Sequence, residues 1–494
     1  MLARRGAAPA VSLLRRRSPR LCSIHATRHL SDESAQGTTQ KQTPPKPSGN
    51  GIQPGSILDN ARKATKVALI TLGAVVTVSS IAWVGGQYWI EARELLPETD
   101  PEVIWWQWDI EGDHWNGDRK RGGTDPNLGA LARMSLRGAW VELNRAPEMD
   151  NLDLVAAYAH RVDSLLQSAI LLAENETTRG RLHPRTLYEL HSRRAEALER
   201  VGASSEAALA YAAVWASGER DGPEEARIAS KLGDLQARLA QPEAALAWWN
   251  KALDLCTGSS DALPTSPPAS PLSQRTMMST LMSMSSYRAT SGQLADAERV
   301  ETAGLELLRA MKAPPLAAAS PPEALHYLFL MNCSAVLGLQ LAEVTYGQQK
   351  KKDPGVPLHW LLQSAKIAER VANVLTGQPA EELPSSVHAL LTKYTDSRSM
   401  KRPAQDLLRD ARRTAAEAWN LAGVLKERSQ PNNPGAALAC YTRAVRWAGT
   451  DPDADDAFNN ASADTRRADW RVYLNNYRRA KNAAESSAGG GQKS

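Results

Sequence analysis

The chain has 494 residues, of which 42% are hydrophobic and 23% are charged, and this ordinary globular composition excludes a wholly disordered or fibrous protein. The four cysteines, at positions 22, 256, 333 and 440, match neither a metal-ligand spacing nor a disulfide framework. The net charge of +5 is uneven, because residues 1–66 hold 12 of the 59 basic residues and only three of the 54 acidic ones. The charge therefore indicates targeting, and it gives little support to a nucleic-acid partner.

The first 30 residues predict a mitochondrial presequence. They contain seven arginines and no acidic residue, spaced among Leu, Ala, Val and Ser, which is typical of transit peptides. A disordered basic tail is the alternative.

Residues 31–60 are rich in Ser, Thr, Gln, Pro and Gly and predict a disordered, flexible linker.

A single transmembrane helix is predicted over residues 67–90. This stretch of 24 residues carries no charge, and a helix of that length, about 36 Å long, would cross a hydrocarbon layer of ~30 Å. A buried core helix is the alternative. Arg62, Lys63 and Lys66 precede the stretch and acidic residues follow it. The positive-inside bias then places the N-terminus in the matrix and the C-terminal domain in the intermembrane space, across the mitochondrial inner membrane.

Residues 91–127 form a tryptophan-rich juxtamembrane segment. Trp105, Trp106, Trp108 and Trp115 follow the predicted span closely, and tryptophan is enriched where a protein meets the membrane surface. We predict an interfacial or interdomain anchor here. The alternative is that these rings plug the end of the soluble core.

Residues 128–482 predict an all-α domain, built as a tetratricopeptide-like solenoid of helical hairpins. Ala, Leu, Glu and Arg dominate, and apolar positions recur at steps of three and four residues. A tetratricopeptide unit repeats every 34 residues, with small side chains at positions 8, 20 and 27 and a bulky one at position 24. A nonrepetitive helical bundle is the alternative.

Three units fit this pattern, with the following residues at positions 8 and 24: Ala195 and Tyr211, Gly233 and Trp249, and Gly423 and Tyr441. A further unit is weaker, because Glu301 stands where an aromatic side chain is expected. Another is split, with helices over 328–344 and 358–371. A closing helix over 463–481 is expected to cap the array, and residues 483–494 to form a disordered tail.

No enzyme motif is present in the sequence. It contains no phosphate-binding loop, no HExxH, no dinucleotide fingerprint and no nucleophile elbow. We therefore expect no catalytic residue, no metal site and no cofactor. Basic pairs such as Arg193 and Arg194 lack the interleaved aromatics of a nucleic-acid groove, so the remaining function is binding of other polypeptides.

The first helices of successive tetratricopeptide units line a groove, and their positions 5, 9 and 13 face a guest peptide. This register predicts the following groove residues: Ser192, Glu196, Arg200, Ser230, Asp234, Arg238, Asn420, Val424 and Arg428. For each of them, ordinary surface polarity is the alternative. Glu196 and Asp234 would repel a C-terminal carboxylate, so we predict a mixed-charge groove for extended or unfolded segments and disfavour chaperone tails.

The layout as a whole resembles a known family. The order of these features is similar to that of the fungal tetratricopeptide adaptor subunit of the mitochondrial inner-membrane i-AAA protease supercomplex. The features are the presequence, the membrane span, the tryptophans, the stretch Gly123-Thr124-Asp125-Pro126 before Leu128-Gly129, and the repeats. The resemblance implies a nonenzymatic adaptor that associates with the i-AAA protease and presents unfolded or unassembled membrane proteins to it. Two alternatives remain: a scaffold or assembly factor for inner-membrane complexes, and an outer-membrane import receptor.

Overall fold

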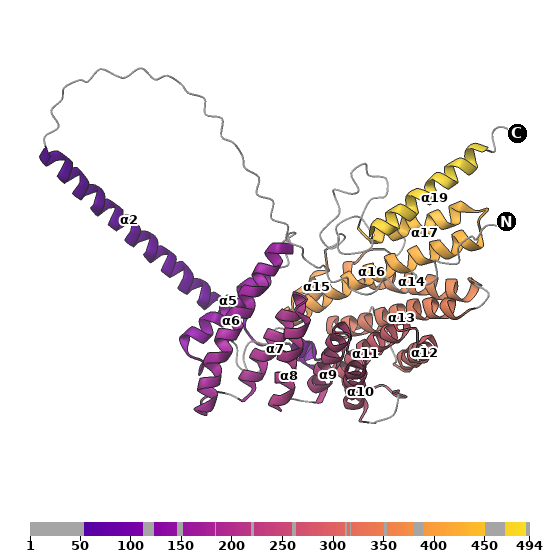
Figure 1. Cartoon of the computed structure of the whole chain (residues 1–494), viewed down its shortest axis with the longest axis horizontal. Coiled ribbons are helices and arrows are strands. Elements are labelled where there is room, and N and C mark those ends of the chain that lie inside the picture. The colour runs from indigo at the N-terminus through magenta and orange to yellow at the C-terminus, as the bar shows by residue number, and fades with distance from the viewer. Residues whose placement is uncertain are drawn as a thin grey trace, which may run out of the picture. The chain divides into compact units, whose positions relative to one another are not determined.

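The computed structural model describes the following residues: 54–111, 123–145, 152–182, 184–218, 222–258, 263–311, 314–316, 318–349, 353–379, 389–449 and 470–490. Within these ranges every regular element is helical and none is a strand (Figure 1), so the all-α class is confirmed for the part described. The expected presequence, residues 31–53 of the expected linker, and Cys22 and Trp115 lie outside these ranges. Helix α2 belongs to one compact unit and the chain from Ile90 onward to another, whose helices from Ala130 onward are here called the body.

Helix α2 (Pro54–Trp89) begins inside the stretch that we expected to be a linker, so the prediction for residues 54–60 is wrong. Proline is pre-organised for the first position of a helix, and no further proline interrupts the sequence before the apolar stretch. By length and composition alone, Arg62–Glu94 is apolar enough to cross a membrane, and none of its most apolar window is buried. It includes the short π-helix η2 (Ile90–Glu94).

The body is a succession of helices in which each packs on the next. Its main members form six consecutive pairs: α5 (Ala130–Arg145) with α6 (Leu152–Thr178), α7 (Pro184–Arg200) with α8 (Ser204–Ser217), α9 (Gly222–Arg238) with α10 (Pro242–Thr257), α11 (Pro271–Thr290) with α12 (Leu294–Ala310), α13 (Pro321–Gln348) with α14 (Gly355–Thr376), and α16 (Arg398–Ser429) with α17 (Pro434–Trp447). The short helix α15 (Thr392–Thr395) packs on α16, and α19 (Trp470–Gly490) packs on α17.

Short turns make the partners within several pairs antiparallel, because two helices joined by three or four residues must double back. Gly202 and Gly292 have φ of +80° in the turns after α7 and α11, a left-handed conformation that glycine adopts without strain. Ala240 takes the same region, with φ of +57°, in the turn after α9. The first helices also contact each other, since α11 packs on both α9 and α13, and α13 packs on α16.

Two of the small-to-bulky pairings that the sequence predicts are confirmed. Gly233 in α9 lies against the Trp249 ring of α10 so closely that a Cβ at 233 would overlap the indole. A Cβ at Gly423 in α16 would come within 2.6 Å of the Tyr441 ring in α17. Glu301, which replaces an aromatic residue in the weaker unit, is buried and accepts a 2.6 Å hydrogen bond from Ser285 Oγ. A polar contact therefore joins α11 and α12 at that point.

Helix α13 is the second helix that is long and apolar enough to cross a membrane, but 67% of its most apolar window is buried inside the body. It has apolar residues around its whole circumference and packs on α11, α12, α14 and α16. Burial of this kind is typical of a core helix. Together with α14 it matches the expected helices over 328–344 and 358–371, extended at both ends.

The end of the chain differs from the prediction. Helix α19 continues to Gly490, so residues 483–490, expected to be a disordered tail, are helical. The sequence after Lys481 is rich in alanine and contains no glycine before Gly489, which favours continuation of the helix. Residues 463–469 of the expected closing helix lie outside the described ranges.

Candidate interaction site: the first-helix face

The first helices of the pairs share a face that the chain itself covers. We call the surface formed by α7, α9, α11, α13 and α16 the first-helix face. Residues 98–111, which include α3 (Pro101–Trp105) and α4 (Trp108–Glu111), contact each of these five helices. The sequence predicts this face as the groove for a guest peptide. The structure shows the chain's own tryptophan-rich segment on the N-terminal part of this face, where Ser192 is the predicted groove residue that lies beside it.

Gln107 and Arg275 hold the centre of this segment. The Gln107 Oε1 atom accepts a hydrogen bond of 2.9 Å from Leu272 N and one of 2.6 Å from Ser270 Oγ, at the N-terminus of α11. Amide groups at a helix N-terminus lack partners within the helix, so an added carbonyl oxygen there is stabilising. The Arg275 guanidinium donates to the backbone carbonyls of Trp106 and Gln107, both at 3.1 Å.

The aromatic residues beside Gln107 pack into the body. The Trp108 side chain is 1% exposed, its Nε1 atom donates to the Pro322 carbonyl at 2.9 Å, and Arg275 lies 3.8 Å above its ring. Trp106 packs on the rings of His326 and Tyr327, with centroid distances of 5.0 and 5.9 Å. The sequence allows either an interfacial or interdomain anchor or packing at the end of the soluble core. Trp106 and Trp108 pack into the soluble core.

Trp105 differs from its neighbours, because its side chain is 75% exposed. The segment thus contacts the body along one side and presents apolar surface on the other. Its preceding turn is also fixed, since the Glu98 carboxylate accepts a 2.7 Å hydrogen bond from Ser397 Oγ at the N-terminus of α16. Burial raises the pKa of Glu98, but hydrogen bonds from Ser397 and from two backbone amides outweigh this effect and lower the pKa below its usual value.

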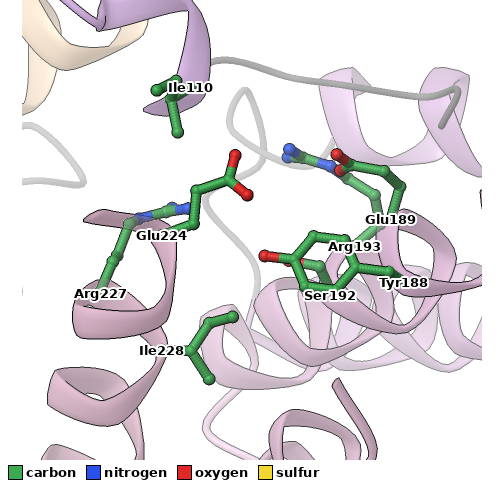
Figure 2. Close-up of a pocket in the computed structure, with 8 residues that line it drawn as sticks. All are labelled: Ile110, Tyr188, Glu189, Ser192, Arg193, Glu224, Arg227 and Ile228. Carbon is green, nitrogen blue, oxygen red and sulfur yellow. The ribbon is translucent and has the colours of Figure 1, made fainter. Parts of the chain in front are cut away.

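Ile110 of α4 extends the contact to α7 and α9. Figure 2 shows its side chain above a shallow pocket whose other lining residues come from these two helices: Tyr188, Glu189, Ser192, Arg193, Glu224, Arg227 and Ile228. The charged side chains of the pocket pair with two residues beside it: Glu189 and Glu224 with Arg185, and Arg193 and Arg227 with Glu196. The pocket therefore joins the segment to α7 and α9 and leaves little room for a small molecule.

Ion pairs between α7 and α9 involve several of the predicted groove residues. The Glu196 carboxylate pairs with Arg193 at 2.8 Å and with Arg227 of α9 at 2.9 Å. Burial raises the pKa of Glu196, but the adjacent arginines outweigh it and lower the pKa to about 2. Glu199 pairs in the same way with Lys231 at 3.1 Å and with the predicted groove residue Arg238 at 3.5 Å. These charges connect neighbouring helices.

Three other predicted groove residues are buried inside the body. Ser192 lines the pocket under Ile110, Ser230 accepts a 2.8 Å hydrogen bond from Thr280 of α11, and Asn420 accepts one of 2.8 Å from Asn476 of α19. Asp234 is half-buried and accepts a 3.0 Å hydrogen bond from Trp249 Nε1, and burial raises its pKa.

The last members of each predicted triplet are exposed, namely Arg200, Arg238 and Arg428. Arg428 reaches Tyr346 Oη of α13 at 3.2 Å, and Val424 is partly buried in the core cluster around α16. The first-helix face therefore brings the predicted groove residues into contacts between helices, and it leaves the arginines at the ends of α7, α9 and α16 accessible. Peptide binding by any of these residues stays a prediction.

Residues 123–125 fasten the start of the body. The Glu91 carboxylate accepts hydrogen bonds from the Thr124 backbone amide at 2.7 Å and from Arg137 at 2.6 Å, and it pairs with Arg133 at 3.0 Å. Asp125 accepts a 2.5 Å hydrogen bond from Thr186 at the start of α7. Thr124 and Asp125 thus join η2, α5 and α7.

Metal and thiol chemistry find no support in the part of the chain that the structure describes. Within those ranges, no group of three or more His, Cys, Asp or Glu side chains is placed to hold a metal ion. Cys256, Cys333 and Cys440 are buried and form no disulfide with each other. Burial raises the pKa of the Cys256 thiol to about 12, and it also raises the pKa of the Cys333 thiol.

No known protein-family profile matches the sequence, and no curated protein is significantly similar to it.

Proposed function

We propose that this chain is a nonenzymatic adaptor of the mitochondrial inner membrane, which binds unfolded or unassembled membrane proteins and presents them to an i-AAA protease. The observation that carries the proposal is a body of paired helices preceded by α2, an apolar helix whose most apolar window is entirely unburied. In this proposal α2 is the single membrane anchor. The arginine-rich N-terminus directs import, and the positive-inside bias puts the body in the intermembrane space.

The proposal includes a tetratricopeptide-type array for the body. Its support is the close approach of Gly233 to Trp249 and of Gly423 to Tyr441, at the two positions where paired helices of such a unit touch. Stacked helical pairs provide a long surface for other polypeptides. The Arg275 and tryptophan contacts on the first-helix face have the composition of binding hot spots.

Crosslinking from the body tests the adaptor function. A photo-crosslinking amino acid at Arg238, which is exposed on the first-helix side, is expected to capture an AAA protease and destabilised membrane proteins from intact mitochondria. The matched control carries the same group at Leu209, which is 72% exposed on the second helix of a pair. Capture of only folded complex subunits would favour the scaffold alternative, and recovery of the native protein alone at monomer size would contradict the adaptor.

Protease protection tests the location separately. The body is expected to resist protease in intact mitochondria and to be cleaved once the outer membrane is opened. Cleavage in intact mitochondria would contradict the proposed topology and favour an outer-membrane receptor.

A further inference from the structure

The contacts between residues 105–108 and the body are those of a bound peptide. Two backbone carbonyls accept from Arg275, one amide side chain accepts at the N-terminus of α11, and two indoles pack against α11 and α13. The residues that make these contacts lie more than 150 positions away in the sequence. The site is therefore built by the body, and the segment enters it from elsewhere in the chain.

The site has a buried polar base. Arg275 is only 2% exposed and His326 is fully buried, and the two side chains contact each other at 3.1 Å. Burial and the nearby Arg275 lower the pKa of His326 to about 3, so this ring is neutral at physiological pH. The second ring nitrogen of His326 contacts Gln274 at 2.9 Å. Arg275 is thus held in position to bind backbone carbonyls.

The occupying segment is weakly structured in itself. Helices α3 and α4 have five and four residues, too few to be stable without tertiary contacts. Gln107 adopts the left-handed region with φ of +57°, which is strained for a residue with a Cβ. Ile104 and Trp105 are exposed on the side away from the body. Release of the segment would also expose the core surface that Val103 and Trp108 cover, because both side chains belong to the buried cluster around α13, α14 and α16.

We infer that this site on α11 and α13 binds tryptophan-bearing juxtamembrane segments of guest membrane proteins, and that residues 105–108 occupy it in the absence of a guest. The inference rests on the proposed adaptor function and specifies its substrate class. Membrane proteins carry tryptophan at the two membrane interfaces, and the chain's own occupant begins at Trp105, 11 positions after the apolar helix ends at Glu94. Segments of the same chemistry in an unassembled guest would present the same indole and carbonyl groups to Arg275.

Because residues 105–108 occupy the site within the same chain, a guest must compete with them to bind. A tethered segment competes at an effective concentration of the order of millimolar, so a free peptide of equal intrinsic affinity binds poorly while the segment is in place. We expect removal of the internal occupant to strengthen binding of an added peptide by at least ~10-fold.

The test uses the full chain in detergent and a fluorescent peptide of residues 99–111. Fluorescence anisotropy is expected to show binding to the Trp108→Ala chain at least ~10-fold tighter than to the unmodified chain. The Trp105→Ala chain is the matched control, because Trp105 is exposed, and it should bind like the unmodified chain. A peptide that itself carries Trp108→Ala should bind neither. A Trp108→Ala chain that keeps its helical circular dichroism and does not bind the peptide would overturn the inference.

Hydrogen exchange of the unmodified chain decides the question without a variant. The amides of residues 101–111 are expected to exchange faster than those of α13, and faster still when excess peptide is added. Exchange of both segments at the same slow rate would show that residues 101–111 open only with the core, which also overturns the inference. Capture of destabilised membrane proteins by the Arg238 crosslinker is read separately. Its loss would refute the adaptor function, and its persistence without peptide binding would refute this inference alone.

Discussion

The contact between Gly233 and Trp249 offers the sharpest test of how α9 and α10 pair. The Trp249 side chain is 1% exposed and its Nε1 atom donates to Asp234 at 3.0 Å. A Cβ at position 233 would occupy the space of the indole. Gly233→Ala therefore forces the ring to turn or the two helices to separate.

The net effect follows from three contributions. Overpacking of a well-filled contact destabilises by about 1–3 kcal/mol, and loss of the Trp249 hydrogen bond adds about 1 kcal/mol. Alanine in place of glycine within a helix stabilises by about 1 kcal/mol. We expect Gly233→Ala to lower the local stability of the pair by about 1–3 kcal/mol.

Hydrogen exchange of the full chain measures this change where it occurs, because repeat-like arrays open locally. Amides of α9 and α10 are expected to exchange roughly 5- to 150-fold faster in Gly233→Ala, which is the loss of about 1–3 kcal/mol expressed as an equilibrium constant. Gly138→Ala is the control, since a Cβ there meets only Leu165 at an ordinary 3.4 Å, and it should slow exchange of α5. Equal slowing in both variants would refute the close contact.

Three further predictions concern charge and burial. Glu196→Gln should be less stable than the unmodified chain above pH 4.5, by a free energy of unfolding of the order of 3 kcal/mol. The difference should shrink as the pH falls from about 4.5 to 2, because the neighbouring arginines stabilise only the ionised carboxylate, whose pKa they lower to about 2. Urea unfolding at a series of pH values measures the difference, and a difference that stays constant down to pH 2 would contradict the prediction. Glu369→Ala should lower the free energy of unfolding by about 2–4 kcal/mol, because the carboxylate accepts hydrogen bonds from the buried indoles of Trp419 and Trp447 at 2.7 and 2.6 Å. Asp406→Ala is the control, since it removes exposed ion pairs and should change the free energy of unfolding by less than about 1 kcal/mol. Equal losses of the two variants in urea unfolding would contradict the stabilising role of Glu369. The three described cysteines should resist maleimide at pH 8 until urea unfolds the chain, and mass spectrometry showing labelling of Cys333 in the native chain would contradict its burial.

The helical pairs could be predicted from the sequence because their closest contacts require particular residue sizes at fixed spacing. Gly233 with Trp249 and Gly423 with Tyr441 are 16 and 18 residues apart, and each pair meets across one short turn. The limits of α2 and α19 were less predictable, since a helix continues through polar residues wherever no glycine or proline stops it. Only the polar composition argued for the linker over residues 54–60.

Several predicted groove residues are buried or paired where the prediction expected exposed side chains, and the reason is different. Their positions within one helix are set by the local repeat, but their exposure depends on what the next repeat supplies. The α7 carboxylates Glu196 and Glu199 meet Arg227 and Lys231, which lie 31 and 32 residues further along the chain. Oppositely charged residues separated in the sequence by nearly one repeat length could therefore have predicted that neighbouring units contact each other at these positions.

Contact between residues 98–111 and the first-helix face had no local signal, because the contacting segments lie far apart in the chain, and those that meet at α11 are more than 150 residues apart. One clue was available in the chemistry. Trp106, Gln107 and Trp108 offer two large rings and an amide that need partners, and α11 begins with Arg275 five positions inside an otherwise weakly charged helix. A buried arginine requires several acceptors, and backbone carbonyls of an entering segment supply them. In the binding site that we infer, the same requirement applies to a guest, because a segment that replaces residues 105–108 must satisfy Arg275 as fully as they do.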